Sequence, residues 1–418
     1  MNLFSPKNHK SINIPIEVDF VRACARLEMT PVWQERVQAY LEEKLDWEKV
    51  REFANHHRVL PLVYHSLYTH FQDSVPEKFL SEMRIAFHAN AARNLFLTDE
   101  LLKVLGWFQA EGIEAIPFKG AALAKDVYGD VVLRQFDDLD VLVREGDVAA
   151  VSEILLSLGY IPVVATVRSE AETFLRHEGE SGFHSPCGRY QVDVHWQLAP
   201  RSFLDVDQAG LWGRSEVVNL NGVEVRTFST QDLLLLLTIH GMGHLWSRHA
   251  WILDFALVIQ GFEELDWREA FECATSKKVE RFLKVGLFLV EELDELDCPE
   301  WAREEIHRDG GARSLAKELF AMPGFHEPKA TSLMKLTLIN ARARQRMVDK
   351  VYYFLSQLLT PSLEDWEVVR LSQNGSVLYR VIRPLRLLNT YGIQPLSKKY
   401  RAPVVEDSIT EKECVRSI

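Results

Sequence analysis

The sequence predicts an α+β protein, with a small mixed α/β sheet between N- and C-terminal helical regions. Apolar residues recur every three to four positions over residues 17–113, which is the spacing of amphipathic helices. Short β-prone runs alternate with helical stretches over residues 114–230, and helical patterns return after residue 230. We therefore expect a helical region over 1–113, an α/β core over 114–230, a helical domain over 231–395 and a polar tail over 396–418.

The elements of the first two regions follow from local patterns. After Pro76 the apolar spacing meets no further proline before Gly112, which predicts one long helix followed by a C-terminal glycine. Asn221-Gly222 predicts a type I′ turn that joins the last two core strands into a hairpin. Core strands are expected at 114–118, 139–143, 160–164, 189–198, 216–220 and 223–228, and core helices at 120–128 and 146–158.

The C-terminal region is predicted to be helical throughout. Ser229 is expected to cap a helix that begins at Thr230, because a serine hydroxyl can accept a hydrogen bond from a free backbone N–H. Further helices are predicted at 249–261, 266–277, 280–293, 299–308, 312–320, 329–357 and 376–388.

The composition is that of a globular protein and excludes several classes. Of the 418 residues, 47% are hydrophobic and 26% are charged, which excludes a disordered chain or a disulfide scaffold. With 48 basic and 60 acidic residues the net charge is −12, which argues against bulk DNA binding, because that affinity depends on neutralised phosphates.

Cysteines and hydropathy predict a cytoplasmic protein without a membrane partner. The five cysteines form no C-x-x-C pair, which indicates reduced thiols. The polar N-terminus lacks the apolar segment of a signal peptide. The longest strongly apolar run, residues 233–239, is far shorter than the roughly 20 residues that span a bilayer.

Three carboxylates are candidate metal ligands and catalytic residues. Asp138 and Asp140 begin a predicted strand and point to the same face, since strand side chains alternate. Asp193 lies on the predicted strand at 189–198 and joins them if the two strands are neighbours. Such a cluster fits Mg²⁺ or Mn²⁺ and the two-metal chemistry of phosphoryl-type transfer. The alternatives are a solvated acidic turn for the first two and an edge-strand carboxylate for Asp193.

Three residues near this strand are candidate triphosphate ligands. Lys119 and Gly120 follow a strand and open a helix, where free N–H groups and the helix dipole favour anions. The Walker A spacing is absent, so an ordinary β-to-α turn is the alternative. Arg134 is either a further triphosphate ligand or a partner of the local acids.

Together these motifs resemble the uncharacterised nucleotidyltransferase family of the DNA polymerase β-like superfamily. The resemblance rests on Lys119-Gly120, Arg134, the stretch from Asp138 to Val143, and Asp193-Val194-His195-Trp196, and covers roughly residues 100–260. It implies metal-dependent transfer of a nucleoside monophosphate from an NTP to the hydroxyl of an acceptor, which could be a small molecule, a peptide or RNA. The Gly-Ser pair of the wider superfamily is here Lys119-Gly120-Ala121, without a hydroxyl.

Three histidines are candidate cleft residues. His195 shares a strand face with Asp193, and His240 and His244 share a helix face at i and i+4. The sequence H-G-M-G-H lacks the zincin glutamate, which excludes a protease of that type. His240 and His244 either line the cleft opposite the carboxylates, where they bind phosphate or the acceptor, or pack helix against sheet.

Two further functions remain open on sequence alone. The same carboxylates could transfer a phosphoryl group in a kinase-like reaction, or the fold could serve as a non-catalytic module that binds protein or RNA. Residues 335–386 carry nine basic and four acidic residues, a net charge of +5, which indicates a solvated basic face or a docking surface for an anionic partner.

Overall fold

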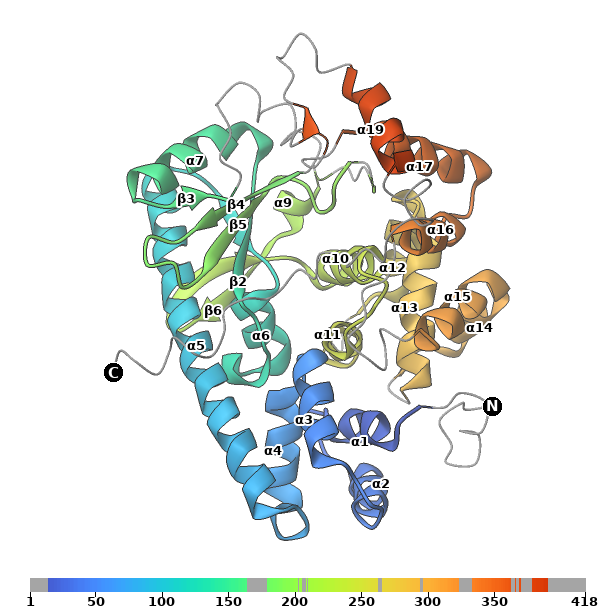
Figure 1. The fold of residues 1–418 in the computed structure, drawn as a ribbon. Helices are drawn as coiled ribbons and strands as arrows, with labels where there is room; N and C mark the ends of the chain where they lie inside the picture. The colour runs from blue at the N-terminus through green and yellow to red at the C-terminus, as the bar shows by residue number, and fades with distance from the viewer. Residues whose placement is uncertain are drawn as a thin grey trace.

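The computed structural model has the predicted α+β architecture (Figure 1). It describes residues 14–163, 179–201, 203–204, 208, 210–261, 265–293, 296–322, 333–361, 365, 368–369 and 378–389. The predicted tail over 396–418 lies outside the described residues. So do residue 164 of the predicted strand at 160–164 and the first residues of the predicted helices at 329–357 and 376–388.

The N-terminal helices surround an apolar cluster that contains Val18, Leu62 and Met83. They are α1 (Ile16–Cys24), α2 (Pro31–Leu41), α3 (Trp47–His56), α4 (Leu60–His70) and α5 (Glu77–Ala110), with a short 3-10 turn η2 (Gln72–Ser74). The prediction of one long helix before Gly112 is confirmed by α5. Its first turns pack on α4, whereas Leu101 and Phe108 in its second half join the cluster under the sheet, so α5 connects the two regions.

The core sheet has five strands in the order β1-β2-β5-β4-β3. Strands β2 and β5 are parallel and the other neighbours are antiparallel, as expected for a mixed sheet. Its strands are β1 (Ala115–Pro117), β2 (Asp138–Val143), β3 (Ile161–Pro162), β4 (Glu180–His184) and β5 (Gln191–His195). The segments between them include α6 (Gly120–Tyr128), α7 (Val148–Ser157) and the 3-10 turns η3 (Val131–Leu133) and η4 (Glu145–Asp147).

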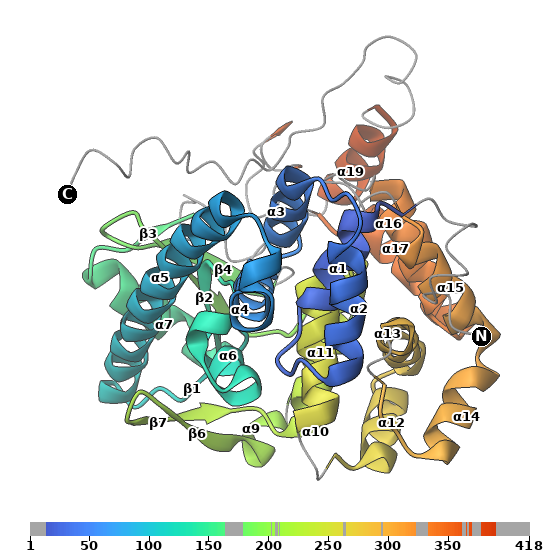
Figure 2. The same ribbon diagram turned by 90° about the horizontal axis from the view of Figure 1, so that it is seen from below.

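The two faces of the sheet contact different helices (Figures 1 and 2). Leu139, Val141 and Val143 of β2 lie in the cluster shared with α5 and α7. Leu142, on the opposite face, lies in the cluster formed by the C-terminal helices. Side chains alternate along a strand, so the face of Leu142 is also the face of Asp138 and Asp140.

Strand β4 is absent from the sequence-based prediction. Its residues, Glu180-Ser181-Gly182-Phe183-His184, include a glycine and no β-branched residue, so their intrinsic preference for a strand is weak. The strand forms because it pairs along its whole length with β5, from Glu180 opposite His195 to His184 opposite Gln191.

The hairpin and the helix start that the sequence predicts are both confirmed. Strands β6 (Glu216–Leu220) and β7 (Val223–Thr227) pair across Asn221 and Gly222, whose φ angles of +53° and +87° suit a type I′ turn. A short helix α9 (Leu211–Arg214) precedes them. The Ser229 hydroxyl accepts a hydrogen bond from the backbone N–H of Asp232 and caps α10 (Thr230–Gly243).

The C-terminal helices cover the carboxylate face of the sheet. After α10 they are α11 (His249–Gly261), α12 (Trp267–Ser276), α13 (Glu280–Glu292), α14 (Glu300–Arg308), α15 (Gly310–Phe320), α16 (Leu333–Ala343), α17 (Met347–Leu359) and α19 (Tyr379–Leu387). Their apolar cluster also contains Ile116, Phe118 and Leu123 of the core, so the apolar interior is continuous across residue 230.

The prediction of one helix over 329–357 is wrong, because the helix is interrupted between α16 and α17. Arg344 turns inward at this break and is buried. Its guanidinium donates to the carbonyl oxygens of Asn340 and Phe203 and lies 3.7 Å from the centroid of the Tyr353 ring. These contacts hold Arg344 inside the molecule at the break between the two helices.

Two further features of the described residues are the state of their cysteines and the character of their helices. Cys24, Cys187, Cys273 and Cys298 are free, and Cys414 lies outside the described residues. None of the helices in the described ranges combines the length and apolar character needed to cross a membrane.

Candidate functional site

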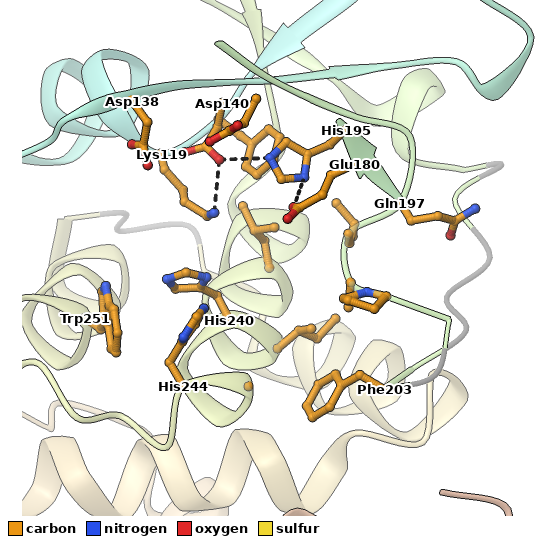
Figure 3. Close-up of a pocket in the computed structure, with 18 of the residues that line it drawn as sticks. Lys119, Asp138, Asp140, Glu180, His195, Gln197, Phe203, His240, His244 and Trp251 are labelled. Atoms are coloured by element: carbon orange, nitrogen blue, oxygen red, sulfur yellow. Dashed lines mark hydrogen bonds and ion pairs between the residues drawn. The ribbon is translucent and has the colours of Figure 1, made fainter. Parts of the chain in front are cut away.

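The register of two parallel strands brings the predicted carboxylates onto one face. Asp140 of β2 is the direct partner of Asp193 of β5, and Asp138 is the partner of Gln191. The predicted adjacency of these strands is therefore confirmed. All three aspartates line a cavity of about 650 Å³ between the sheet and the C-terminal helices. Figure 3 shows Asp138 and Asp140 at this cavity.

Asp140 is the most strongly held of the three carboxylates. Its Oδ1 accepts hydrogen bonds from Lys119 Nζ at 3.3 Å and from His195 Nε2 at 2.9 Å. Burial alone would raise the pKa of Asp140, but the Lys119 cation and the His195 hydrogen bond outweigh it and lower the pKa to about 2. Asp140 is therefore a permanent anion at the centre of the site.

The pKa values of Asp138 and Asp193 are shifted upward, opposite to that of Asp140. Burial raises the pKa of both, and the negative charge of Asp140 raises it further, to about 6 for Asp193. The amide of Gln191 donates to Asp193 Oδ1 at 2.6 Å and partly opposes this shift. The three aspartates thus repel one another, as like charges on one strand face must.

The donor chemistry of this face fits a hard divalent cation. Mg²⁺ and Mn²⁺ prefer carboxylate oxygens, and a cation would relieve the repulsion that, together with burial, raises the pKa of Asp138 and Asp193. In the described part of the chain, however, no three His, Cys, Asp or Glu side chains stand close enough together to hold a metal ion. The Asp140 oxygen that faces the site is bonded to Lys119 and His195 instead.

Lys119 and Gly120 occupy the β-to-α turn that the sequence predicts. Lys119 is the N-cap of α6 with a φ of +58°, an unusual backbone conformation for a residue with a Cβ. Gly120, with a φ of +42°, lies against the Asp138 carbonyl, where a Cβ would come within 3.5 Å of that oxygen. The start of α6 is therefore close to the carboxylate strand, and both residues line the cavity.

His195 connects the carboxylates to Glu180, a residue that the sequence-based prediction missed. Its Nδ1 lies 3.0 Å from Glu180 Oε2, and its Nε2 bonds Asp140. Burial alone would lower the pKa of His195, but these two hydrogen bonds raise it to about 9. The ring is therefore protonated and donates from both nitrogens. Only the unpredicted strand β4 brings Glu180 to this place, so no local sequence signal marked it.

His240 and His244 line the cavity wall opposite the carboxylates (Figure 3). Their rings lie 4.6 Å apart and contact the Trp251 ring at 5.1 and 5.0 Å. Loss of hydration inside the cavity, followed by the nearby Lys119 cation, lowers the pKa of His240 well below its usual value and that of His244 to about 4. Both imidazoles are therefore neutral near pH 7.

Arg134 lines the same cavity, but its charge is committed to a carboxylate far away in the sequence. Its Nε and one terminal nitrogen donate to the two carboxylate oxygens of Asp254 on α11, each at 2.9 Å. Tyr128 donates to the same carboxylate at 2.6 Å. The sequence analysis offered two roles for Arg134, a triphosphate ligand or a partner of acids near it in the sequence. It did not foresee a buried ion pair with Asp254, 120 residues away.

Comparisons with known proteins identify a family. The sequence model of a family described as "uncharacterised nucleotidyltransferase" matches residues 43–294. No curated protein matches the chain. Among solved structures, that of the antibiotic-resistance factor ANT(2'')-Ia is similar over 51% of this chain and 98% of its own, with a TM-score of 0.26 and 13% identity. A likeness of that size bears on neither activity nor substrate.

The family match carries the assignment. It covers more than half of the chain and includes each predicted site residue, from Lys119 to His244. The chain belongs to the family of uncharacterised nucleotidyltransferases.

Proposed function

We propose that the protein is a metal-dependent nucleotidyltransferase that moves a nucleoside monophosphate from an NTP to an acceptor hydroxyl. The observation that carries the proposal is the parallel register of β2 and β5, which pairs Asp140 with Asp193 and leaves Asp138 on the same face. The N-terminus of α6 lies beside this face, with Lys119 in contact with Asp140. In such an arrangement the carboxylates can bind the metal ion, and the free N–H groups of the helix N-terminus can bind the triphosphate.

The residues then have distinct roles. Asp138, Asp140 and Asp193 would hold Mg²⁺ or Mn²⁺ together with phosphate oxygens of the NTP, because these carboxylates alone do not stand close enough to hold the ion. When bound, the ion supplies charge stabilisation on the phosphates and a lowered pKa of the acceptor hydroxyl. Lys119 and the first backbone N–H groups of α6 bind the triphosphate. His195, held between Asp140 and Glu180, fixes the orientation of the Asp140 carboxylate.

The acceptor side of the cavity is assigned to the histidines. His240 and His244 are neutral and face the carboxylates, so their nitrogens can accept a hydrogen bond from an acceptor hydroxyl (Figure 3). We propose that the acceptor is a small molecule, a peptide or RNA. We also propose that the protein acts in the cytoplasm.

The test combines metal binding with pyrophosphate release. The wild-type protein should bind Mn²⁺ in a calorimetric titration and should release pyrophosphate from an NTP when Mg²⁺ is present. Asp140→Asn and Asp193→Asn should each lower both signals by at least about 100-fold, since even residues behind the ligands cost 10- to 100-fold in such sites. The matched control is Asp137→Asn, because Asp137 is adjacent but pairs with Arg58 and Arg93 instead.

The label on the NTP distinguishes the alternatives. Transfer of an α-phosphate label to an acceptor supports nucleotidyl transfer, whereas transfer of a γ-phosphate label alone would establish the kinase-like reaction. Wild-type protein that binds neither Mn²⁺ nor NTP would contradict the proposal and leave a binding module.

A further inference from the structure

Exposed apolar side chains are concentrated on the C-terminal helices. More than half of the large apolar residues that are exposed in the described part of the chain lie between residues 334 and 388. Six of them, on α17 and α19, have exposed fractions between 51% and 77%. We call the following six the outer apolar face: Met347, Val348, Val351, Tyr352, Val381 and Leu385.

Helical periodicity places the α17 residues of the outer apolar face on one side of α17, and the α19 residues on one side of α19, which packs against α17. Met347, Val351 and Leu355 recur every four residues along α17, and Val381 and Leu385 do so along α19. The two helices contact each other at the outside of the molecule (Figure 1). Exposed fractions of this size mean that the side chains project into solvent, whereas side chains that line a groove are shielded on two sides.

Basic side chains without a described carboxylate partner lie beside the outer apolar face. Arg346, Lys350 and Arg380 lie on the same two helices or at their starts, and within the described ranges no carboxylate forms an ion pair with them. The acids described in this segment are paired elsewhere, Asp349 with Lys278 and Asp365 with Arg383 and Arg386. Residues 335–386 carry +5 of a total of −12, so the rest of the chain carries −17.

We propose that the outer apolar face docks on an anionic lipid surface. Protruding apolar side chains beside uncompensated cations are the pattern of helices that lie in a membrane interface, where apolar groups enter the lipid and cations meet the headgroups. The −17 on the remaining chain is repelled by such a surface, which favours an approach through this face. An isologous contact between two copies would instead bring two cationic faces together.

Docking in this way has a consequence for the cavity. The inner sides of the same helices line it through Tyr353, Gln357 and Arg383. The cavity would therefore lie close to the lipid surface. No spanning helix is required. The proposal therefore departs from the sequence-based expectation of no membrane partner, which rested on the lack of a spanning segment.

The experiment is co-sedimentation of the full-length protein with two kinds of vesicle, phosphatidylcholine alone and phosphatidylcholine with phosphatidylglycerol. The protein should sediment with the anionic vesicles and not with the neutral ones, and added salt should weaken binding. The triple variant Met347→Ser, Val348→Ser and Tyr352→Ser should bind at least about tenfold more weakly, because it removes three apolar groups from the contact. Arg346→Gln with Arg380→Gln should reduce binding to anionic vesicles.

A matched control uses exposed apolar residues far from the outer apolar face. Val32→Ser with Ile85→Ser changes side chains of similar exposure, 72% and 69%, and should leave vesicle binding unchanged. All these positions are exposed, and unchanged thermal unfolding would show that the variants fold. No binding to anionic vesicles, or equal binding by the triple variant and wild type, would overturn the proposal. A wild-type dimer that the triple variant dissociates would overturn it in favour of a second copy.

Discussion

Asp193 depends on a glycine in the strand beside it. Gly182 of β4 is the direct partner of Asp193. A Cβ at this glycine would come within 2.9 Å of Asp193 Oδ1 and 2.7 Å of Gln191 Nε2. Glycine leaves the space in which the carboxylate and its amide partner sit, so this residue shapes the site without reacting.

Gly182→Ala should therefore weaken metal binding more than it weakens the fold. The methyl group must displace the movable ends of Gln191 and Asp193 and a methyl group of Val163, which it would approach to 2.9 Å. The free energy of unfolding should therefore fall by about 1–3 kcal/mol. Mn²⁺ affinity, measured by calorimetry, should fall by about tenfold or more. Ser181→Ala is the control, because position 181 points to the other face of the sheet. Equal Mn²⁺ affinity in both variants would contradict this role for Gly182.

A second residue, His249, should make stability depend on pH. It begins α11, is buried, and its backbone N–H donates to His57 Nδ1 at 3.3 Å. Burial lowers the pKa of His249 well below its usual value of 6.5, and the Arg22 and Arg26 cations lower it further. The unfolded chain therefore takes up a proton near pH 6.5 that the folded protein does not bind.

The free energy of unfolding should consequently fall as the pH is lowered from 7 to 5. The His249 contribution to that loss is at most about 2 kcal/mol. His249→Asn should show a smaller loss in urea unfolding at the two pH values, whereas His88→Asn, at an exposed position on α5, should behave like wild type. Identical pH dependence in wild type and His249→Asn would refute the assignment.

At the scale of elements, three helices meet around one tryptophan. Trp246 follows α10 and is fully buried. Its ring packs on Gly241 of α10 and Gly286 of α13, where an added Cβ would come within 2.5 and 2.9 Å of the indole, and it contacts Phe255 of α11 at 5.3 Å. The two glycines let the indole lie directly against helix backbones.

Gly241→Ala should destabilise the protein although alanine is the better helix former. Forcing a methyl group into the indole should cost about 1–3 kcal/mol. Gly106→Ala is the opposite case, since Gly106 lies within α5 with no atom within 4 Å of an added Cβ, and should stabilise by about 0.5–1 kcal/mol. Chemical unfolding of both variants measures the difference. If Gly241→Ala were as stable as Gly106→Ala, the packing argument would fail.

At the scale of the whole molecule, the predicted regions share their interiors. The cluster of the C-terminal helices includes Ile116 and Leu142 of the core, and the N-terminal cluster includes Tyr128 of α6 and Leu253 of α11. The ion pair between Arg134 and Asp254 crosses the same boundary, with Asp254 fully buried. The walls of the cavity are thus held together by both apolar and ionic contacts.

Removing one partner of this ion pair should lower the free energy of unfolding more than removing both partners. Arg134→Leu leaves the buried Asp254 carboxylate without its cation and should lower the free energy of unfolding by about 3–5 kcal/mol. The double variant Arg134→Leu with Asp254→Leu should recover most of that loss, because no buried charge remains. Tyr128→Phe removes one hydrogen bond and should cost only about 1 kcal/mol. Equal stability of Arg134→Leu and wild type in urea unfolding would show that the pair does not stabilise the fold.

Some of the site could be predicted because it depends on short-range chemistry. The i and i+2 spacing sets Asp138 and Asp140 on one face whatever surrounds the strand. Lys119-Gly120 could be placed at a helix start, and His240 and His244 on one helix face, for the same reason. The family match and the register of β2 and β5 then support the interpretation of these motifs.

The sequence by itself determined the elements whose signals are local, such as α5, the Asn221-Gly222 hairpin and the cap of α10 by Ser229. Only the tertiary structure decided the partners of charged groups across more than a hundred residues, as in Arg134 with Asp254. It also decided β4, which brings Glu180 to His195 through pairing with β5. Local propensity acts over one or two turns of chain, whereas burial and pairing energies depend on neighbours that only the folded chain supplies.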